Sequence, residues 1–136
     1  MASSYLTKAR VRRKALEVYL ADQDFSDVVR EAQEIVELTT KAILRAIGVE
    51  PPKRHHVGDL IAEYQDRLPE GRWAELVKAS KWLRKERELA FYGDVDFIPT
   101  DEYTEEDASR AIQAADLAIE LAARVLGKSG SDIQSP

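Results

Sequence analysis

The sequence predicts an all-α protein, an up-and-down antiparallel bundle of four long helices and one short helix. Apolar residues recur at helical spacing in five segments, and no segment alternates convincingly with a period of two. The links between the long segments are short, which favours antiparallel neighbours. With 136 residues, the chain can bury one core. We therefore expect a single domain over residues 1–126 and a flexible C-terminal tail over residues 127–136.

The first two predicted helices cover about residues 5–21 and 27–47, and the turn ADQDFS joins them. Asp24 or Ser26 can cap the second helix, because short polar side chains accept hydrogen bonds from its first free N–H groups. The second helix has a wide apolar stripe, so we expect it at the centre of the bundle, with neighbours on more than one side. Gly48 suits the left-handed position that ends a helix.

The third predicted helix is short, about residues 57–67, and the fourth covers about residues 72–92. The last runs from about residue 104 to 126 and ends at Gly127. Its start, TEED, is a capping pattern because an acid stands three residues after Thr104. One side of the fourth helix is largely apolar and is made up of Trp73, Leu76, Ser80, Leu83, Ala90 and Phe91.

Arg87 interrupts that apolar side, close to its middle. A guanidinium keeps its charge, so burying it without a partner is costly. Three explanations stay open. In the first, the aliphatic stem of Arg87 packs on the core while its guanidinium reaches water. In the second, an internal acid, Glu34 or Glu37, pairs with the guanidinium. In the third, this side of the helix lines a cleft between two subunits, where an anion or phosphate satisfies the charge.

Tyr92 and Asp94 follow Arg87 where the helix stops. Gly93 between them permits a turn that would let both side chains bend back toward Arg87. The simpler interpretation makes Tyr92 an aromatic residue at the rim and Asp94 a turn residue. Both interpretations stay open.

Charge is spread unevenly over the chain, whose formal net charge is −5. Residues 1–14 carry five basic groups and no acid, whereas residues 94–120 carry nine acids and a single basic residue, Arg110. Further basic clusters are PKRHH at 52–56 and KASKWLRKER at 78–87, the latter containing Lys81 and Arg84. Such clusters indicate either charges paired across neighbouring helices or a basic surface for phosphates.

We expect no metal site and no cofactor. The chain has no cysteine, and the adjacent pair His55 and His56 is a weak metal signal because zinc ligands are usually spaced to converge. No GxGxxG, P-loop, nucleophile elbow or HExxH occurs. No apolar run approaches the roughly 20 residues of a membrane span, and no signal peptide is evident, so we expect a cytoplasmic protein without membrane contact.

Two stretches together resemble a known family. AQEIVELTTKAILRAIGVEPPKRHHVGDL, residues 32–60, is similar to the pattern of HEPN domains (higher eukaryotes and prokaryotes nucleotide-binding). RKERELAFYGD, with YTEEDASRAI downstream, looks like one prokaryotic branch of that family. The residues that match the first pattern are Glu37, Lys41, Ala42, Gly48, Pro51 or Pro52, His55 or His56, and Leu60.

The resemblance implies a helical bundle that dimerises. It also implies a partner, because many relatives are encoded beside a minimal nucleotidyltransferase and act with it as a toxin–antitoxin pair. Active HEPN ribonucleases carry arginine, four to six residues and then histidine, and both subunits contribute this motif to one cleft. The arginine maps onto Arg87, but Tyr92 stands where the histidine would be.

This difference separates three functional hypotheses. A tyrosine, with an ordinary pKa of ~10, is a poor general base near neutral pH, although it can stack on a base or hydrogen-bond a phosphate. The leading hypothesis is a dimeric protein that binds nucleotide, RNA or a nucleotidyltransferase. The second is a metal-independent endoribonuclease using Arg84, Arg87 and Tyr92, and the third a pure interaction module. The residues of the expected binding site are Lys81, Arg84, Arg87, Tyr92 and Asp94.

Overall fold

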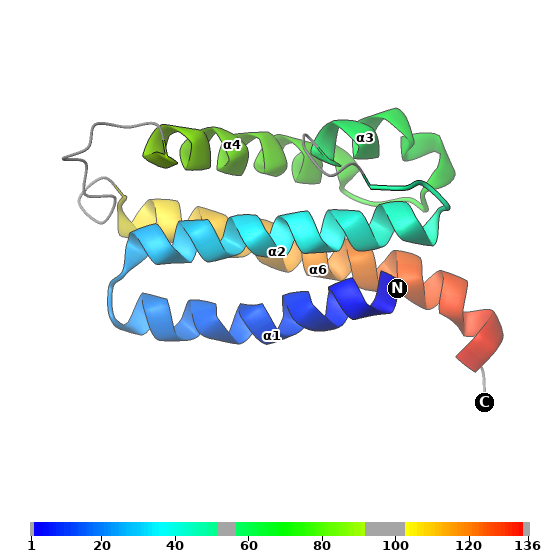
Figure 1. Cartoon of the computed structure of the whole chain (residues 1–136), viewed down its shortest axis with the longest axis horizontal. Helices are drawn as coiled ribbons and strands as arrows, with labels where there is room; N and C mark the ends of the chain where they lie inside the picture. Colours follow the sequence, from blue (N-terminus) through cyan, green and yellow to red (C-terminus); the bar gives the residue numbers. More distant parts are fainter. Residues whose placement is uncertain (1, 52–56, 92–102, 135–136) are drawn as a thin grey trace.

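Four long helices run side by side in alternating directions, and a short helix packs beside the fourth (Figure 1). The computed structural model describes residues 2–51, 57–91 and 103–134, and these residues contain helices but no strand. The predicted fold class is confirmed. The elements are α1 (Ala2–Ala21), α2 (Phe25–Ala46), α3 (Val57–Glu63), a 3₁₀ turn η1 (Gln65–Arg67), α4 (Trp73–Phe91) and α6 (Glu105–Gln134).

Helix α2 lies at the centre of the bundle, as its wide apolar stripe predicts. It packs against α1 and α6 along most of its length and against α3 and α4 on another side. Two threonines, Thr39 and Thr40, are also fully buried there, and each hydroxyl donates to a carbonyl oxygen one turn earlier. The buried apolar residues of α2 are Val28, Val29, Ala32, Ile35, Val36, Ala42, Ile43 and Leu44.

The ends of α2 have the predicted local chemistry. Asp24 is the N-cap, and one of its carboxylate oxygens accepts from the backbone N–H of Asp27 at 3.4 Å. At the other end Gly48 has a φ of +81°, the left-handed conformation that a glycine adopts without strain. Together these features stop α2 on both sides.

Helix α4 turns its predicted apolar side toward the core. Trp73, Leu76 and Leu83 are buried and Ser80 is half-buried. The indole N–H of Trp73 donates to the carbonyl oxygen of Pro69 at 2.6 Å, which satisfies its polar group. The side chains of residues 87–91 lie outside the described ones, although the backbone of α4 continues to Phe91.

Three predicted helix boundaries are wrong. The first helix begins at Ala2 rather than near residue 5, and the third ends at Glu63, with residues 65–67 forming a 3₁₀ turn. The last helix continues to Gln134 and extends past the other helices (Figure 1), because a glycine inside a helix costs only about 1 kcal/mol and Gly127 does not stop it. The flexibility expected of residues 127–136 stays a prediction.

Charged side chains pair across neighbouring helices, as one of the two interpretations of the charge pattern expects. Arg12 on α1 contacts Glu31 on α2 at 3.0 Å. Arg13 on α1 reaches Asp116 on α6, with 2.6 Å from its Nε to Oδ1. These bonds tie α1 to two neighbours.

No helix within the described ranges combines the length and the low polarity that crossing a lipid bilayer requires.

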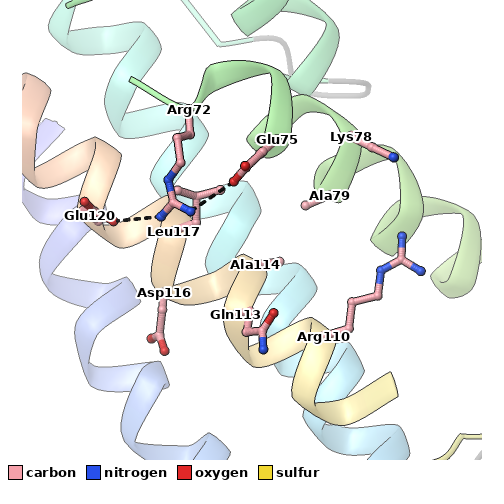
Figure 2. A pocket seen from close by; sticks show the side chains of 10 residues that line it. All are labelled: Arg72, Glu75, Lys78, Ala79, Arg110, Gln113, Ala114, Asp116, Leu117 and Glu120. Atoms are coloured by element: carbon pink, nitrogen blue, oxygen red, sulfur yellow. Dashed lines mark hydrogen bonds and ion pairs between the residues drawn. The ribbon is translucent and has the colours of Figure 1, made fainter. Parts of the chain in front are cut away.

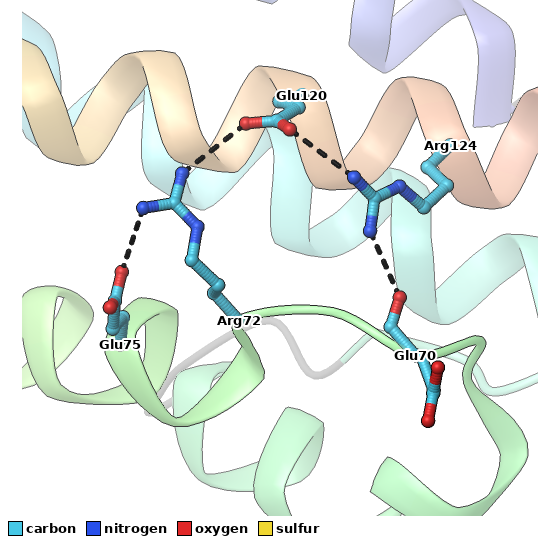
Figure 3. A network of polar contacts seen from close by, with 5 residues as sticks. All are labelled: Glu70, Arg72, Glu75, Glu120 and Arg124. Atoms are coloured by element: carbon cyan, nitrogen blue, oxygen red, sulfur yellow. Dashed lines mark hydrogen bonds and ion pairs between the residues drawn. The ribbon is translucent and has the colours of Figure 1, made fainter.

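A polar network fixes the start of α4 against α6 (Figure 3). Arg72 contacts Glu75 at 3.1 Å and Glu120 at 3.4 Å, and Arg124 contacts the other oxygen of Glu120 at 3.2 Å. Arg124 also donates to the backbone carbonyl of Glu70 at 2.9 Å. The segment that leads into α4 is thereby held on α6 at a defined position.

Candidate functional site

The five residues of the predicted binding site belong to α4 and the segment after it. The structure describes the side chains of Lys81 and Arg84. The backbone of Arg87 is helical, but its side chain lies outside the described part, and Tyr92 and Asp94 lie outside it entirely. The three explanations for Arg87 therefore all remain open.

Lys81, Arg84 and Lys85 form a basic edge on α4, which we call the α4 edge. Two of its residues meet Asp59 on α3, since Lys81 Nζ lies 4.0 Å from Oδ1 and Arg84 Nη1 lies 3.8 Å from Oδ2. The Lys81 side chain is 58% exposed and that of Arg84 30%. Such long, exposed contacts contribute little to stability, so Lys81 can exchange its carboxylate contact for a ligand at low cost.

A groove lies between α4 and α6 (Figure 2). Its volume is about 530 Å³. Ala79 on α4 and Ala114 and Leu117 on α6 contribute apolar surface to it, and the buried Ala114 and Leu117 form its floor. Because these side chains are small or buried, the two helices leave room for another molecule between their polar rims.

The two ends of this groove differ in charge. At one end Arg72 holds both Glu75 and Glu120. At the other end lie Lys78 on α4 and Arg110 on α6, and neither forms an ion pair with another described residue. Asp116, another acid of the groove, pairs with Arg13, and this hydrogen bond raises the pKa of the Arg13 guanidinium above its ordinary value.

Arg110 is held in place by an aromatic ring. Its guanidinium carbon lies 4.1 Å from the centre of the Trp82 ring on α4. A cation over an indole face is attracted by the ring quadrupole, and the planar guanidinium stacks on it. Neither Arg110 nor Lys78 is among the site residues predicted from the sequence. Arg110 is the single basic residue in the segment 94–120, which carries nine acids, and this isolation could have indicated a special role from the sequence alone.

Metal binding finds no support in the described residues, because no three carboxylate or imidazole side chains gather closely enough there to hold an ion. His55 and His56 lie outside the described part, together with Lys53 and Arg54.

The described residues thus form an all-α bundle with a basic edge on α4. A family model described as the HEPN domain matches residues 2–126. The chain belongs to the HEPN domain family. Neither a curated protein nor a solved structure matches it significantly.

Membership of the HEPN family indicates a general class of function. It supports a nucleotide- or RNA-binding or ribonuclease-like role, and HEPN domains commonly dimerise. The assignment to a prokaryotic branch through RELAFYGD stays a prediction, as do the individual site residues.

Proposed function

We propose that this HEPN protein is a dimer that binds a nucleotide or RNA through α4, and that it acts with a minimal nucleotidyltransferase as a toxin–antitoxin-like pair. The binding residues in this proposal are Lys81, Arg84, Arg87, Tyr92 and Asp94. Family membership supports the class of ligand. The observation that carries the choice of surface is the α4 edge, which presents three basic side chains within five residues of one helix.

The spacing on α4 suits a phosphate backbone. Lys81 and Lys85 are four residues apart, so they are neighbours on the helix surface, and both are exposed. Arg84 lies on the same edge, and Arg87 follows it after three residues, about one turn further along. A row of cations along one helix follows the charge of a nucleic-acid strand without reading its sequence.

Binding without cleavage is the favoured chemistry. Cleavage of RNA needs a group that takes and gives a proton near neutral pH, and tyrosine does this poorly. Tyr92 instead offers a ring for base stacking and a hydroxyl for a phosphate oxygen. The endoribonuclease remains the second candidate, because Arg87 stands in the position of the family's motif arginine.

Affinity for RNA tests the proposal. A labelled single-stranded RNA is titrated at several salt concentrations with the wild type and with a Lys81→Gln/Lys85→Gln double variant. We expect the variant to bind roughly tenfold weaker and to lose about two units of the slope of log affinity against log salt. The matched control is Lys8→Gln/Lys14→Gln, which removes two exposed lysines from α1. Equal affinity in all three proteins, or no binding in any, would reject the proposal.

Two further measurements separate the alternatives. Incubating RNA in chelator tests for cleavage, and cleavage that Tyr92→Phe and Arg87→Ala both abolish would favour the endoribonuclease. Cleavage that neither variant affects points to contamination. Light scattering tests the dimer, and co-purification with a nucleotidyltransferase encoded next to this chain tests the partner. A dimer whose melting temperature no nucleotide or RNA raises would favour the pure interaction module.

A further inference from the structure

We propose that the groove between α4 and α6 is a second binding site, for a small molecule that carries a phosphate monoester. Arg110 and Lys78 would hold the phosphate, and the floor formed by Ala114 and Leu117 would hold the apolar part of the molecule. The groove is lined by residues of α4 and α6, whereas Lys81 and Arg84 of the α4 edge contact Asp59 on α3. The two surfaces are adjacent, because Lys78 and Lys81 are three residues apart on α4.

The charges that line the groove are not fully balanced among themselves. Three basic and three acidic side chains line it. The acids have arginine partners, since Glu75 and Glu120 contact Arg72 and Asp116 contacts Arg13. Lys78 and Arg110 have no carboxylate partner among the described residues, and Asp107, on the same helix as Arg110, caps the backbone N–H of Thr104 at 3.1 Å. Two cations are thus left together at one end.

One aromatic ring, that of Trp82, lies beside both cations' positions on the helices. Trp82 follows Lys78 by four residues on α4, so the two side chains are neighbours on the helix surface. Arg110 stacks on that same Trp82, and both Arg110 and Lys78 line the groove. Stacking limits the motion of the guanidinium, so less entropy is lost when its N–H groups bind a ligand.

The charges and hydrogen-bond donors of Arg110 and Lys78 suit a phosphate monoester better than a carboxylate. A phosphate monoester carries about −1.5 to −2 charges near pH 7, which matches two cations, whereas a carboxylate carries one. A guanidinium binds two phosphate oxygens with parallel hydrogen bonds, and an ammonium adds a point charge. Arg110 and Lys78 supply one of each.

The size and the apolar floor of the groove indicate what kind of group the ligand carries besides its phosphate. A volume of about 530 Å³ lies within the range of small-molecule sites. The apolar floor favours a flat or apolar body over a bare ion, and the exposed amide of Gln113 adds two N–H donors and a carbonyl acceptor at the rim.

Titration with phenyl phosphate tests this inference, with inorganic phosphate and benzoate as comparison ligands. Binding is measured by calorimetry and by NMR of the methyl groups of Ala79 and Ala114. We expect phenyl phosphate to bind more tightly than inorganic phosphate, which lacks the ring, and than benzoate, which lacks the second charge. Both methyl signals should shift with phenyl phosphate.

Substitutions then assign the site. Arg110→Gln and Lys78→Gln should each weaken phenyl phosphate binding roughly tenfold. The matched controls Arg10→Gln and Lys14→Gln, at exposed positions of α1, should leave it unchanged. The inference is overturned by absence of methyl shifts, by unchanged affinity in both groove variants, or by benzoate binding as tightly as phenyl phosphate.

Discussion

Gly58 on α3 faces Ser80 on α4 so closely that a Cβ atom at Gly58 would lie 2.6 Å from the Ser80 hydroxyl oxygen and 2.9 Å from its Cβ. Real Cβ atoms do not approach other atoms this closely. The absence of a side chain at Gly58 therefore sets the distance between the short helix and α4, which carries the proposed binding edge.

Replacing Gly58 by alanine should destabilise the protein, although the same change in an open helix is stabilising. The clash forces α3 away from α4, and overpacking of this kind costs about 1–3 kcal/mol. The control is Gly127→Ala, where a Cβ would meet no atom within 4 Å beyond its chain neighbours and its own helix backbone, and where helix propensity alone should stabilise by about 1 kcal/mol. Urea unfolding measures both. A stabilised Gly58→Ala variant would contradict the close contact.

Replacing Thr104 by alanine should lower the free energy of unfolding by about 1 kcal/mol. The backbone N–H of Asp107 donates to the Thr104 hydroxyl at 3.1 Å, and the backbone N–H of Thr104 donates to the Asp107 carboxylate at 3.1 Å. This reciprocal cap begins α6, as TEED predicts. Thr104→Ser keeps the hydroxyl and should lose little. Equal stability of the alanine variant and the wild type would show that the cap contributes nothing.

Replacing Asp27 by asparagine should change how stability depends on pH. The hydrogen bond between the two carboxyl groups raises the pKa of Asp27 above its usual 3.8 and lowers that of Asp24. The stability linked to the Asp27 proton is present below pH 3.8 and lost as the pH rises through the raised pKa. An asparagine amide at position 27 can donate to the Asp24 carboxylate at every pH, so Asp27→Asn loses none of this stability as the pH rises.

We therefore expect Asp27→Asn to be more stable than the wild type at pH 7, by about 0.5 kcal/mol, and to lose this advantage in acid. The lost contact with Arg30, 3.5 Å long and 68% exposed on the arginine side, subtracts little. Asp22→Asn in the same turn is the control, since its side chain is exposed. Parallel stability–pH curves for Asp27→Asn and the wild type would contradict the raised pKa of Asp27.

Local patterns predicted most of the fold. Helical spacing of apolar residues depends on neighbours three and four apart, so it revealed the bundle, the central place of α2 and the inner side of α4. Gly48 and Thr104 act through groups within a few residues, and both behave as their types predict. Gly127 failed as a stop signal because a glycine lowers helix stability without ending the helix.

The groove could not be predicted, because it depends on how α6 is rotated against α4. Trp82 and Arg110 are 28 positions apart, and nothing in either helix alone indicates that they stack. The same holds for Arg13 and Asp116, which are 103 positions apart. The sequence pattern identified α4 as the helix that carries most of the proposed binding residues. It could not decide between an internal partner for Arg87 and a ligand, since both satisfy the same charge.

The central claim is that Arg87 serves a ligand, and one comparison tests it most directly. RNA affinity and unfolding free energy are measured together for the wild type, Arg87→Ala and the control Arg10→Ala, which removes an exposed arginine of α1. We predict that Arg87→Ala binds RNA at least roughly tenfold more weakly while its stability stays within about 1 kcal/mol of the wild type. Unchanged RNA affinity with a stability loss of about 3–5 kcal/mol would contradict the claim and assign Arg87 to an internal carboxylate such as Glu34 or Glu37.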